Sequence, residues 1–230
     1  MTVDRSNIPE RGPVDPHEGI GHLRLDLGCG QRKRKGFIGV DCIPAPGVDV
    51  VADLEASLPF EDNSAIEVHC HSVIEHLSEP IQFLDEVHRI LHPSGTLRVY
   101  VPHFSNPYGH SDPTHRHLYG LYSFQYLTPQ ERQHFRRKVP DHYTSAHWEV
   151  LSQRLIFLGE TRVGMFLGRA FGKLVNSHTR VQAFYERLLC WQIPCYALSV
   201  ELRPMKDRNE PSSTSHALTK EVTPDRKTHT

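Results

Sequence analysis

Long apolar runs are missing from this sequence. Nowhere do about 18 apolar residues follow one another, so no membrane-spanning helix is expected. Segment 1–21 also lacks the apolar core of a secretory signal, because Pro, Asp, Glu and Arg are spread along it. These absences argue against a membrane anchor and against a signal peptide.

Cysteine pairs and an excess of one charge are missing as well. The five cysteines are an odd number, none forms a C-x-x-C pair, and three lie in apolar, strand-like segments. This usage predicts reduced thiols in a reducing, cytoplasmic compartment. The 26 basic and 27 acidic residues give a net charge of -1, which supplies no overall attraction to nucleic acid or to an anionic membrane. We therefore expect a small-molecule substrate, and neither nucleic acid nor a membrane as partner.

The composition suits one globular domain with a tail at each end. The chain has 230 residues, 38% of them hydrophobic, which is enough for a core. Segment 1–21 is rich in proline and charge and is predicted to be a flexible arm. Segment 207–230 has almost nothing apolar and is predicted to be a disordered tail. The domain is expected to span residues 22–206.

Strand-like and helix-like patterns alternate through this domain. Short apolar segments predict seven strands, at residues 22–27, 37–41, 48–53, 65–70, 96–101, 148–158 and 196–202. Apolar residues at helical spacing in 80–91 predict an amphipathic helix that ends at the Pro–Gly turn 92–95. Further helices are predicted from Thr128-Pro129 and at 164–175 and 181–190. Such alternation is typical of a parallel sheet covered by helices on both faces.

Three acidic residues fall at or near the ends of the first three predicted strands. They are Asp26, Asp41 and Asp53, and the bend Gly28–Gly30 follows the first strand. Doubly wound sheets bind ligands beyond the carboxyl ends of their strands, and glycine lets the backbone turn tightly against a ligand. A carboxylate after the second strand can accept hydrogen bonds from both ribose hydroxyls, and one after the third can accept from an adenine amine. The set predicts an adenosine-containing ligand.

The glycine bend does not fit a dinucleotide. The fingerprint G-x-G-x-x-G would need glycine at Lys33, which makes a pyrophosphate ligand less plausible. An acidic loop with few glycines suits a ligand that has cationic groups and no phosphate, such as S-adenosylmethionine. Only residues 31–37 separate the bend from the second strand, too few for a crossover helix, so a loop or single turn is expected.

Five segments in order resemble class I, S-adenosylmethionine-dependent methyltransferases, in particular the type 11-like group. Leu25-Asp-Leu-Gly-Cys-Gly30 resembles their motif I, and Gly39-Val-Asp41 resembles the ribose-binding strand. The adenine-binding segment of the family resembles Ala52-Asp-Leu54 together with Leu58-Pro-Phe60. The segment that passes under the methionyl part resembles Ser72-Val-Ile-Glu-His-Leu77, and the turn before strand five resembles Leu91-His-Pro-Ser-Gly95. The resemblance covers about residues 22–104.

The resemblance implies both a fold and a set of cofactor contacts. The fold would be α/β, a Rossmann-like doubly wound sheet of seven strands, mostly parallel with the last strand antiparallel. S-adenosyl-L-methionine would be the cofactor. The predicted cofactor-binding residues are Asp26, Gly28, Cys29, Gly30, Asp41, Cys42, Asp53, Leu54, His71 and Ser72.

A histidine-rich segment, 102–117, follows the fifth predicted strand and faces the expected methyl group. Methyl transfer needs alignment of donor and acceptor and, where the acceptor carries a proton, a base. Histidine has a suitable pKa near neutrality. We predict His115 as the base, with His103 as second choice. In the alternative interpretation, Asp112 and His115 only organise the loop by hydrogen bonding.

A metal site is a weaker possibility. Some methyltransferases of ubiquinone synthesis and of small-RNA 3′ ends hold a divalent ion with the Glu and His of a similar E-x-x-E-H stretch, but Ser72 stands at its first position here. Near a helix start, His71, Glu75 and His76 could place two ligands on one face. In the simpler interpretation His71 lines the cofactor pocket and Glu75 caps or pairs. No metal ligand is therefore predicted.

Together the residues predict methyl transfer to an oxygen, nitrogen or carbon of a small molecule in biosynthesis. The residues that choose the acceptor are expected within 103–147 and 160–195. Two alternatives stay open. The histidines are compatible with another reaction on the same fold, such as cyclisation or elimination, and the basic run Arg32–Lys35 with a non-catalytic partner protein or RNA binder.

Overall fold

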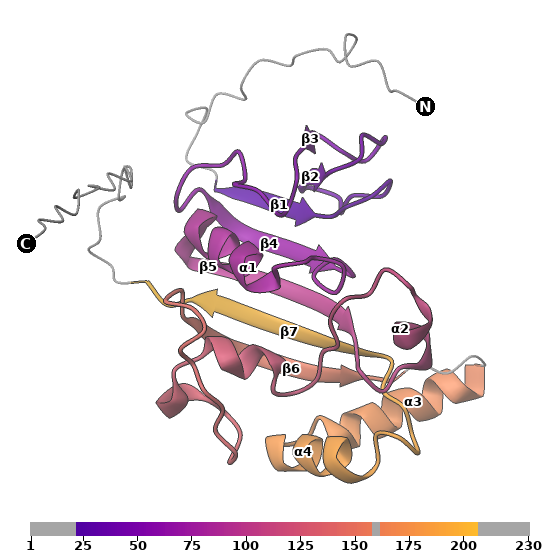
Figure 1. The fold of residues 1–230 in the computed structure, drawn as a ribbon. Helices are drawn as coiled ribbons and strands as arrows, with labels where there is room; N and C mark the ends of the chain where they lie inside the picture. Colours follow the sequence, from indigo (N-terminus) through magenta and orange to yellow (C-terminus); the bar gives the residue numbers. More distant parts are fainter. Residues whose placement is uncertain (1–21, 158–161, 207–230) are drawn as a thin grey trace, which may run out of the picture.

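The computed structural model describes residues 22–157 and 162–206, so the predicted arm and tail lie outside the described residues. Its strands form one sheet in the order β3-β2-β1-β4-β5-β7-β6 (Figure 1). The strands are β1 (Leu23–Leu27), β2 (Ile38–Asp41), β3 (Val50–Val51), β4 (Ala65–His71), β5 (Leu91–Pro102), β6 (Trp148–Ile156) and β7 (Ala197–Pro204). The described α-helices are α1 (Pro80–Ile90), α2 (Pro107–Ser111), α3 (Arg162–Val175) and α4 (Thr179–Leu188).

Strand directions confirm the predicted fold class. β1 pairs in parallel with β2 and β4, β2 with β3, and β4 with β5. β7 runs antiparallel to both β5 and β6. Every predicted strand is present, although the third is reduced to two residues, Val50–Val51. The carboxyl ends of the parallel strands therefore meet at one edge of the sheet. We call it the carboxyl edge: residues 28–30, 41–43, 72–77 and 103–106.

Helix α1 forms where the apolar spacing predicts it. Pro80 occupies the first turn, where its missing N–H costs no hydrogen bond. The buried side chains Phe83, Leu84, Val87 and Ile90 line its inner face. Strand β5 follows at once, and the residues of the predicted turn, 92–95, loop out between the pairs Ala65–Leu91 and Glu67–Thr96. The helix therefore packs directly on the strand that follows it.

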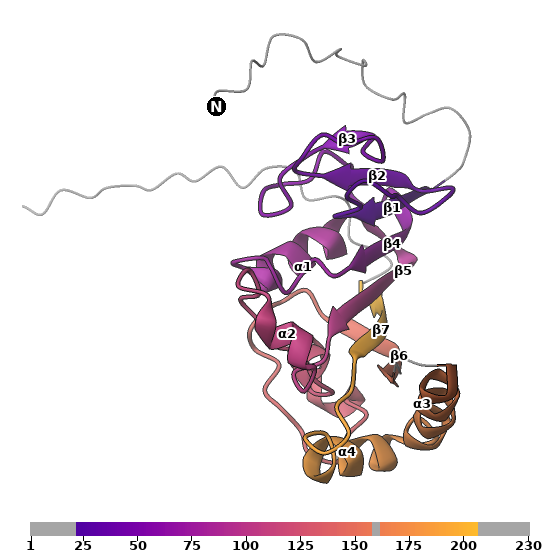
Figure 2. The ribbon, with the colours of Figure 1, turned by 90° about the vertical axis from the view of Figure 1, so that its right-hand side faces the viewer.

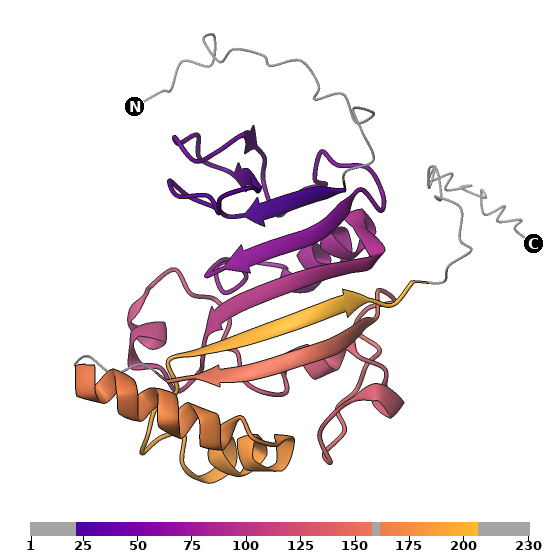
Figure 3. The same cartoon turned by 180° about the vertical axis from the view of Figure 1, so that it is seen from behind.

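The expectation that helices cover both faces of the sheet is wrong for the described residues. Helix α1 lies in front of β4 and β5 in Figure 1, on the face that carries buried apolar residues such as Leu25, Val68 and Val200. Seen from behind, no described helix lies over β1, β4, β5 or β7 (Figure 3). The reason is visible in the strands, which alternate apolar and polar residues, whereas strands buried on both faces are apolar throughout.

Ion pairs cross the uncovered face from strand to strand. Glu67 on β4 lies 2.6 Å from an Arg24 nitrogen on β1 and 3.0 Å from an Arg98 nitrogen on β5. Arg98 also lies 3.3 Å from Glu201 on β7. Burial acts to raise the pKa of Glu67, but the guanidinium groups of Arg24 and Arg98 lower it overall. This face is therefore held by a polar ladder instead of a second apolar core.

Residues 123–132 do not form the helix predicted from Thr128-Pro129. The structure has only two 3₁₀ turns there, Ser123–Leu127 and Gln130–Arg132. Buried Gln133 explains the interruption, because its side-chain amide donates to three backbone carbonyls and holds the chain in an irregular path. The other two predicted helices are present as α3 and α4, which lie beyond the β6 edge (Figure 2). None of the helices in the described residues could cross a membrane.

Candidate functional site

The glycine bend after β1 is fixed against the end of β2. The N–H groups of Gly28 and Cys29 both donate to the Val40 carbonyl, at 2.8 and 3.2 Å. The N–H of Gly30 donates to the Asp41 carboxylate at 2.9 Å. The structure thus brings together two features that the sequence separates, the bend and the carboxylate after the second strand.

Three residues at the carboxyl edge adopt left-handed backbone conformations. Gly28 has φ 69°, Gly30 has φ 55° and Ser72, which follows β4, has φ 54°. Ser72 is held there by its N–H, which donates to the Tyr100 carbonyl at 2.8 Å. A non-glycine residue in this region costs about 1–3 kcal/mol, and such residues cluster at ligand sites.

The three predicted aspartates each organise their own loop. Asp26 is 8% exposed and accepts the Arg34 N–H at 2.7 Å. Asp41 also accepts the Ile43 N–H at 3.1 Å, and Asp53 accepts the Glu55 N–H at 2.9 Å. A carboxylate offers about four lone-pair sites, so each can still accept from a ligand hydroxyl or amine.

The electrostatics of the bend suit a cationic ligand. Burial raises the pKa of the Cys29 thiol, and the negative charges of Asp26 and Asp41 raise it further. Partial burial and the negative charge of Asp41 also raise the pKa of the Cys42 thiol. These residues therefore fit S-adenosylmethionine, whose sulfonium and ammonium groups are positive. Of the basic run that follows, Lys33 is already paired with Asp49.

The remaining predicted cofactor residues lie around the same edge. Leu54 is 7% exposed and belongs to the core. His71 is exposed and stacks on Tyr100 with ring centroids 4.3 Å apart. Stacking leaves the outer face of the imidazole available, which is compatible with a ligand ring at the end of β4.

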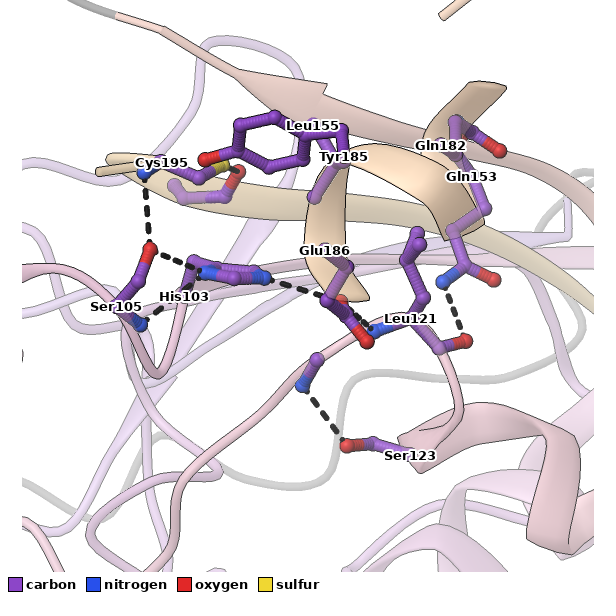
Figure 4. Close-up of polar contacts among 12 residues, drawn as sticks. His103, Ser105, Leu121, Ser123, Gln153, Leu155, Gln182, Tyr185, Glu186 and Cys195 are labelled. Carbon is purple, nitrogen blue, oxygen red and sulfur yellow. Dashed lines mark hydrogen bonds and ion pairs between the residues drawn. The ribbon is translucent and has the colours of Figure 1, made fainter. Parts of the chain in front are cut away.

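His103, the second predicted base, is fully buried and engaged through both ring nitrogens (Figure 4). Its Nδ1 accepts the Ser105 N–H at 3.1 Å, and its Nε2 lies 3.1 Å from the Glu186 carboxylate. The same carboxylate oxygen accepts the Leu121 N–H at 2.8 Å. The pair thus ties helix α4 to the end of β5, a placement that favours a structural role for His103. Glu186 could not be identified from the sequence, because nothing in its local pattern points to β5.

His103→Ala should lower the free energy of unfolding by about 1–3 kcal/mol, since Glu186 and Ser105 would lose a buried partner. The affinity for S-adenosylmethionine should stay unchanged. Urea unfolding and calorimetry measure the two quantities, with exposed His142→Ala as control. A variant as stable as the wild type would contradict this role.

His115, the first predicted base, lies beside Glu75 and His76. Ligating atoms of these three residues all lie within 4.8 Å of one another. His71, which the sequence analysis grouped with Glu75 and His76, stays apart at its stack on Tyr100. The expected helix start is also wrong, because a turn follows β4 and α1 begins only at Pro80.

A cavity of about 420 Å³ opens near the His103–Glu186 pair. Its lining includes the aromatic side chains Phe104, Tyr122, Tyr126 and Trp191, together with Glu186. These residues fall within 103–147 and 160–195, where the sequence analysis placed the substrate region. Trp191 was not singled out from the sequence, because it lies outside every recognisable motif.

Comparison with known proteins gives a family match and a shared fold. Residues 30–99 match the family model described as a methyltransferase domain. A chain from the complex between the Haloferax volcanii Trm112 methyltransferase activator and a methyltransferase is 18% identical, covers 82% of this chain and 85% of that one, and has a TM-score of 0.50. A SAM-dependent methyltransferase from Archaeoglobus fulgidus is 16% identical, with 80% and 86% covered and a TM-score of 0.47. No curated protein matches.

The structural similarity shows the fold, and the family match adds the domain type. At 18% identity the Haloferax structure supports the arrangement of the sheet alone. The matched residues 30–99 contain the strands β2 to β5 up to Val99 and the last glycine of the bend. Residues 30–99 are therefore similar to a methyltransferase domain, and the domains of this class use S-adenosylmethionine.

Proposed function

We propose that the protein transfers the methyl group of S-adenosylmethionine to a small molecule. The observation that carries the proposal is the hydrogen bond from Gly30 to Asp41, which joins the bend after β1 to the carboxylate after β2. This arrangement leaves Asp41 beside a backbone surface without side chains, where a ribose can lie. Asp53, after β3, is then placed to accept from the adenine amine.

The chain's own residues would mainly bind and orient the reactants. When bound, S-adenosylmethionine would supply an activated methyl group, with its sulfonium sulfur as the leaving group. Asp26 and Asp41 favour the positive cofactor. His115, whose Nε2 is the less engaged of the predicted bases' nitrogens, is placed to receive an acceptor proton. The aromatic cavity beside Glu186 is proposed as the acceptor site.

Cofactor binding can be tested with Asp41→Asn. The amide keeps an oxygen for the Gly30 N–H but removes the negative charge, so the affinity for S-adenosylmethionine should fall by about tenfold, or 1.4 kcal/mol. Calorimetry measures this affinity, and exposed Glu131→Gln should bind like the wild type. In thermal unfolding, the cofactor at about 100 times its Kd should add about 2.7 kcal/mol to the wild type. Equal affinity in Asp41→Asn would remove the ribose assignment.

The reaction itself is tested by product analysis with candidate small molecules. Methyl transfer yields one S-adenosylhomocysteine for each methylated product. Substrate consumption without S-adenosylhomocysteine would refute methyl transfer and support cyclisation or elimination. Cofactor binding without any turnover over a broad acceptor panel would favour a non-catalytic protein.

A further inference from the structure

Glu75 is a buried carboxylate that lacks hydrogen-bond partners. It lies in the turn after β4 and is 1% exposed. Neither side-chain oxygen has a partner among the described residues. Buried charges in proteins are normally paired or coordinate a metal ion, so Glu75 calls for an explanation.

Two imidazoles converge on this carboxylate from different parts of the chain. His76 is its neighbour in the turn, and His115 comes from the histidine-rich segment after β5. The two rings meet edge to face, with centroids 4.7 Å apart. The segments are held together because the N–H groups of Arg116 and His117 both donate to the backbone carbonyl of Glu75, at 2.8 and 3.3 Å.

Hydrogen bonds also fix which nitrogen of each ring is available. His115 Nδ1 lies 2.7 Å from the Gly109 carbonyl, which can only accept, so Nδ1 carries the proton. His76 Nδ1 lies 2.9 Å from the Thr114 hydroxyl, which donates its own proton to Asp112 at 2.6 Å and must therefore accept from His76. In both neutral rings the lone pair is on Nε2. Metal-binding histidines are oriented in this manner by an oxygen acceptor on the other nitrogen.

The loop contacts explain Nδ1 of each ring. Nε2 of His115 also lies 3.6 Å from the Asp112 carboxylate, which is beyond hydrogen-bond distance, and no loop contact accounts for the Glu75 carboxylate. A structural clamp would need only the bonds to Gly109 and Thr114. It would not need a buried carboxylate without partners opposite two nitrogen lone pairs. The unexplained atoms are the ones that a cation would bind.

We propose that Glu75, His76 and His115 form a binding site for one divalent transition-metal ion of the Zn²⁺ type. Two imidazoles and one carboxylate are borderline ligands that suit Zn²⁺ and its neighbours better than Mg²⁺ or Ca²⁺. At a ligand distance of about 2.1 Å, donor atoms in a tetrahedral site lie about 3.4 Å apart. The observed atoms, within 4.8 Å of one another, therefore need to close by at most about 1.4 Å. The site departs from the sequence prediction, which assigned no metal ligand.

An ion at this position would change the role of His115 from base to ligand. The three protein ligands would leave the fourth position of a tetrahedral ion free for a water or an acceptor. An ion held by these residues would make an acceptor hydroxyl more acidic, so that its proton could pass to solvent. Only this role depends on the proposed function; ion binding itself does not.

Metal titration of the full-length protein tests the site directly. After removal of metals with EDTA, Co²⁺ should bind with a stoichiometry of one and give visible d–d absorption, and Zn²⁺ should displace it. Glu75→Gln and His115→Gln should each weaken binding by about 10- to 100-fold. Because the chain has 17 histidines, His134→Gln, an exposed histidine outside the cluster, serves as matched control and should bind like the wild type.

Thermal unfolding separates loss of the site from loss of the fold. In EDTA, Glu75→Gln should unfold at or above the wild-type temperature, because it removes a buried charge. Zn²⁺ should raise the unfolding temperature of the wild type and not of Glu75→Gln. Absence of one-to-one binding in the wild type, or binding that survives both substitutions, would overturn the proposal. S-adenosylmethionine affinity measured in EDTA tests the cofactor assignment separately.

Discussion

Replacing Gly28 by alanine should abolish cofactor binding and lower the free energy of unfolding by about 2–4 kcal/mol. Two penalties combine at this position. The backbone has φ 69°, which alanine adopts at a cost. An added Cβ would also lie 2.4 Å from Cγ2 of Val73, in the segment after β4. The bend must therefore move away from β4, and with it the surface proposed for the ribose.

Gly30→Ala is the matched control, because it isolates the backbone penalty. Gly30 has a similar φ of 55°, but nothing lies within 4 Å of an added Cβ. We expect a loss of only about 1–2 kcal/mol there. Combining Gly28→Ala with Val73→Ala should relieve the clash and make the double variant more stable than the sum of the single effects. Urea unfolding and calorimetry measure stability and affinity. Equal losses at Gly28 and Gly30 would show that contact with Val73 is unimportant.

Acidification should destabilise the protein through His88, by about 2–3 kcal/mol between pH 7.5 and pH 4.5. This residue on α1 packs edge to face on buried Trp148, with ring centroids 5.2 Å apart. Its Nε2 has no partner among the described residues. Burial, and after it the positive charge of Lys206, lower the pKa of His88 to about 4.

The sign of the effect follows from where the proton binds. The unfolded histidine has a pKa of about 6.5, so below that pH the unfolded chain takes up a proton that the folded chain refuses until about pH 4. The stabilisation that neutral His88 contributes is therefore present above about pH 6.5, and it is lost as the pH falls from there to about 4. Glu67, whose pKa is lowered, adds a loss at still lower pH.

The contribution of His88 to the pH dependence of stability is obtained by comparing a His88 variant with the wild type. His88→Phe should remove about 2–3 kcal/mol of the pH dependence, while exposed His134→Gln should leave it intact. Urea unfolding at a series of pH values, followed by circular dichroism, gives each curve. Parallel curves for His88→Phe and the wild type would exclude His88 as the source.

The central sheet could be predicted because its signals are local. The apolar strand segments, the helical spacing at Phe83, Leu84, Val87 and Ile90, and the glycine bend each depend on neighbouring residues. The short connection 31–37 also behaves as predicted, with no helix between β1 and β2. The exception was the polar face of the sheet. Polar residues such as Arg24, Glu67 and Arg98 alternate with apolar ones along the strands, which indicates a face without covering helices, but the strands were interpreted as buried on both faces.

Long-range pairings could not be predicted from the sequence. His103 and Glu186 are 83 positions apart, and only the packing of α4 beside β5 brings them together. The same holds for His115, which meets Glu75 because residues after β4 and β5 reach one edge of the sheet. The failed helix at Thr128 has a similar cause, since the three hydrogen bonds of Gln133 depend on a buried position that no local pattern announces.

The connection between β1 and β2 has a consequence for the fate of the spent cofactor. In many nucleotide-binding sheets a helix begins there and presents its positive dipole end to a phosphate. All residues of this connection are described here and none is helical, so no helix dipole faces the bend, and the carboxylates of Asp26 and Asp41 are hydrogen-bonded to its backbone. Under the proposed function, the sulfur would be neutral once the methyl group has left, and these carboxylates would attract the remnant less strongly than the fresh cofactor. The proposed reaction would thereby favour exchange of the used molecule for a charged one at this loop.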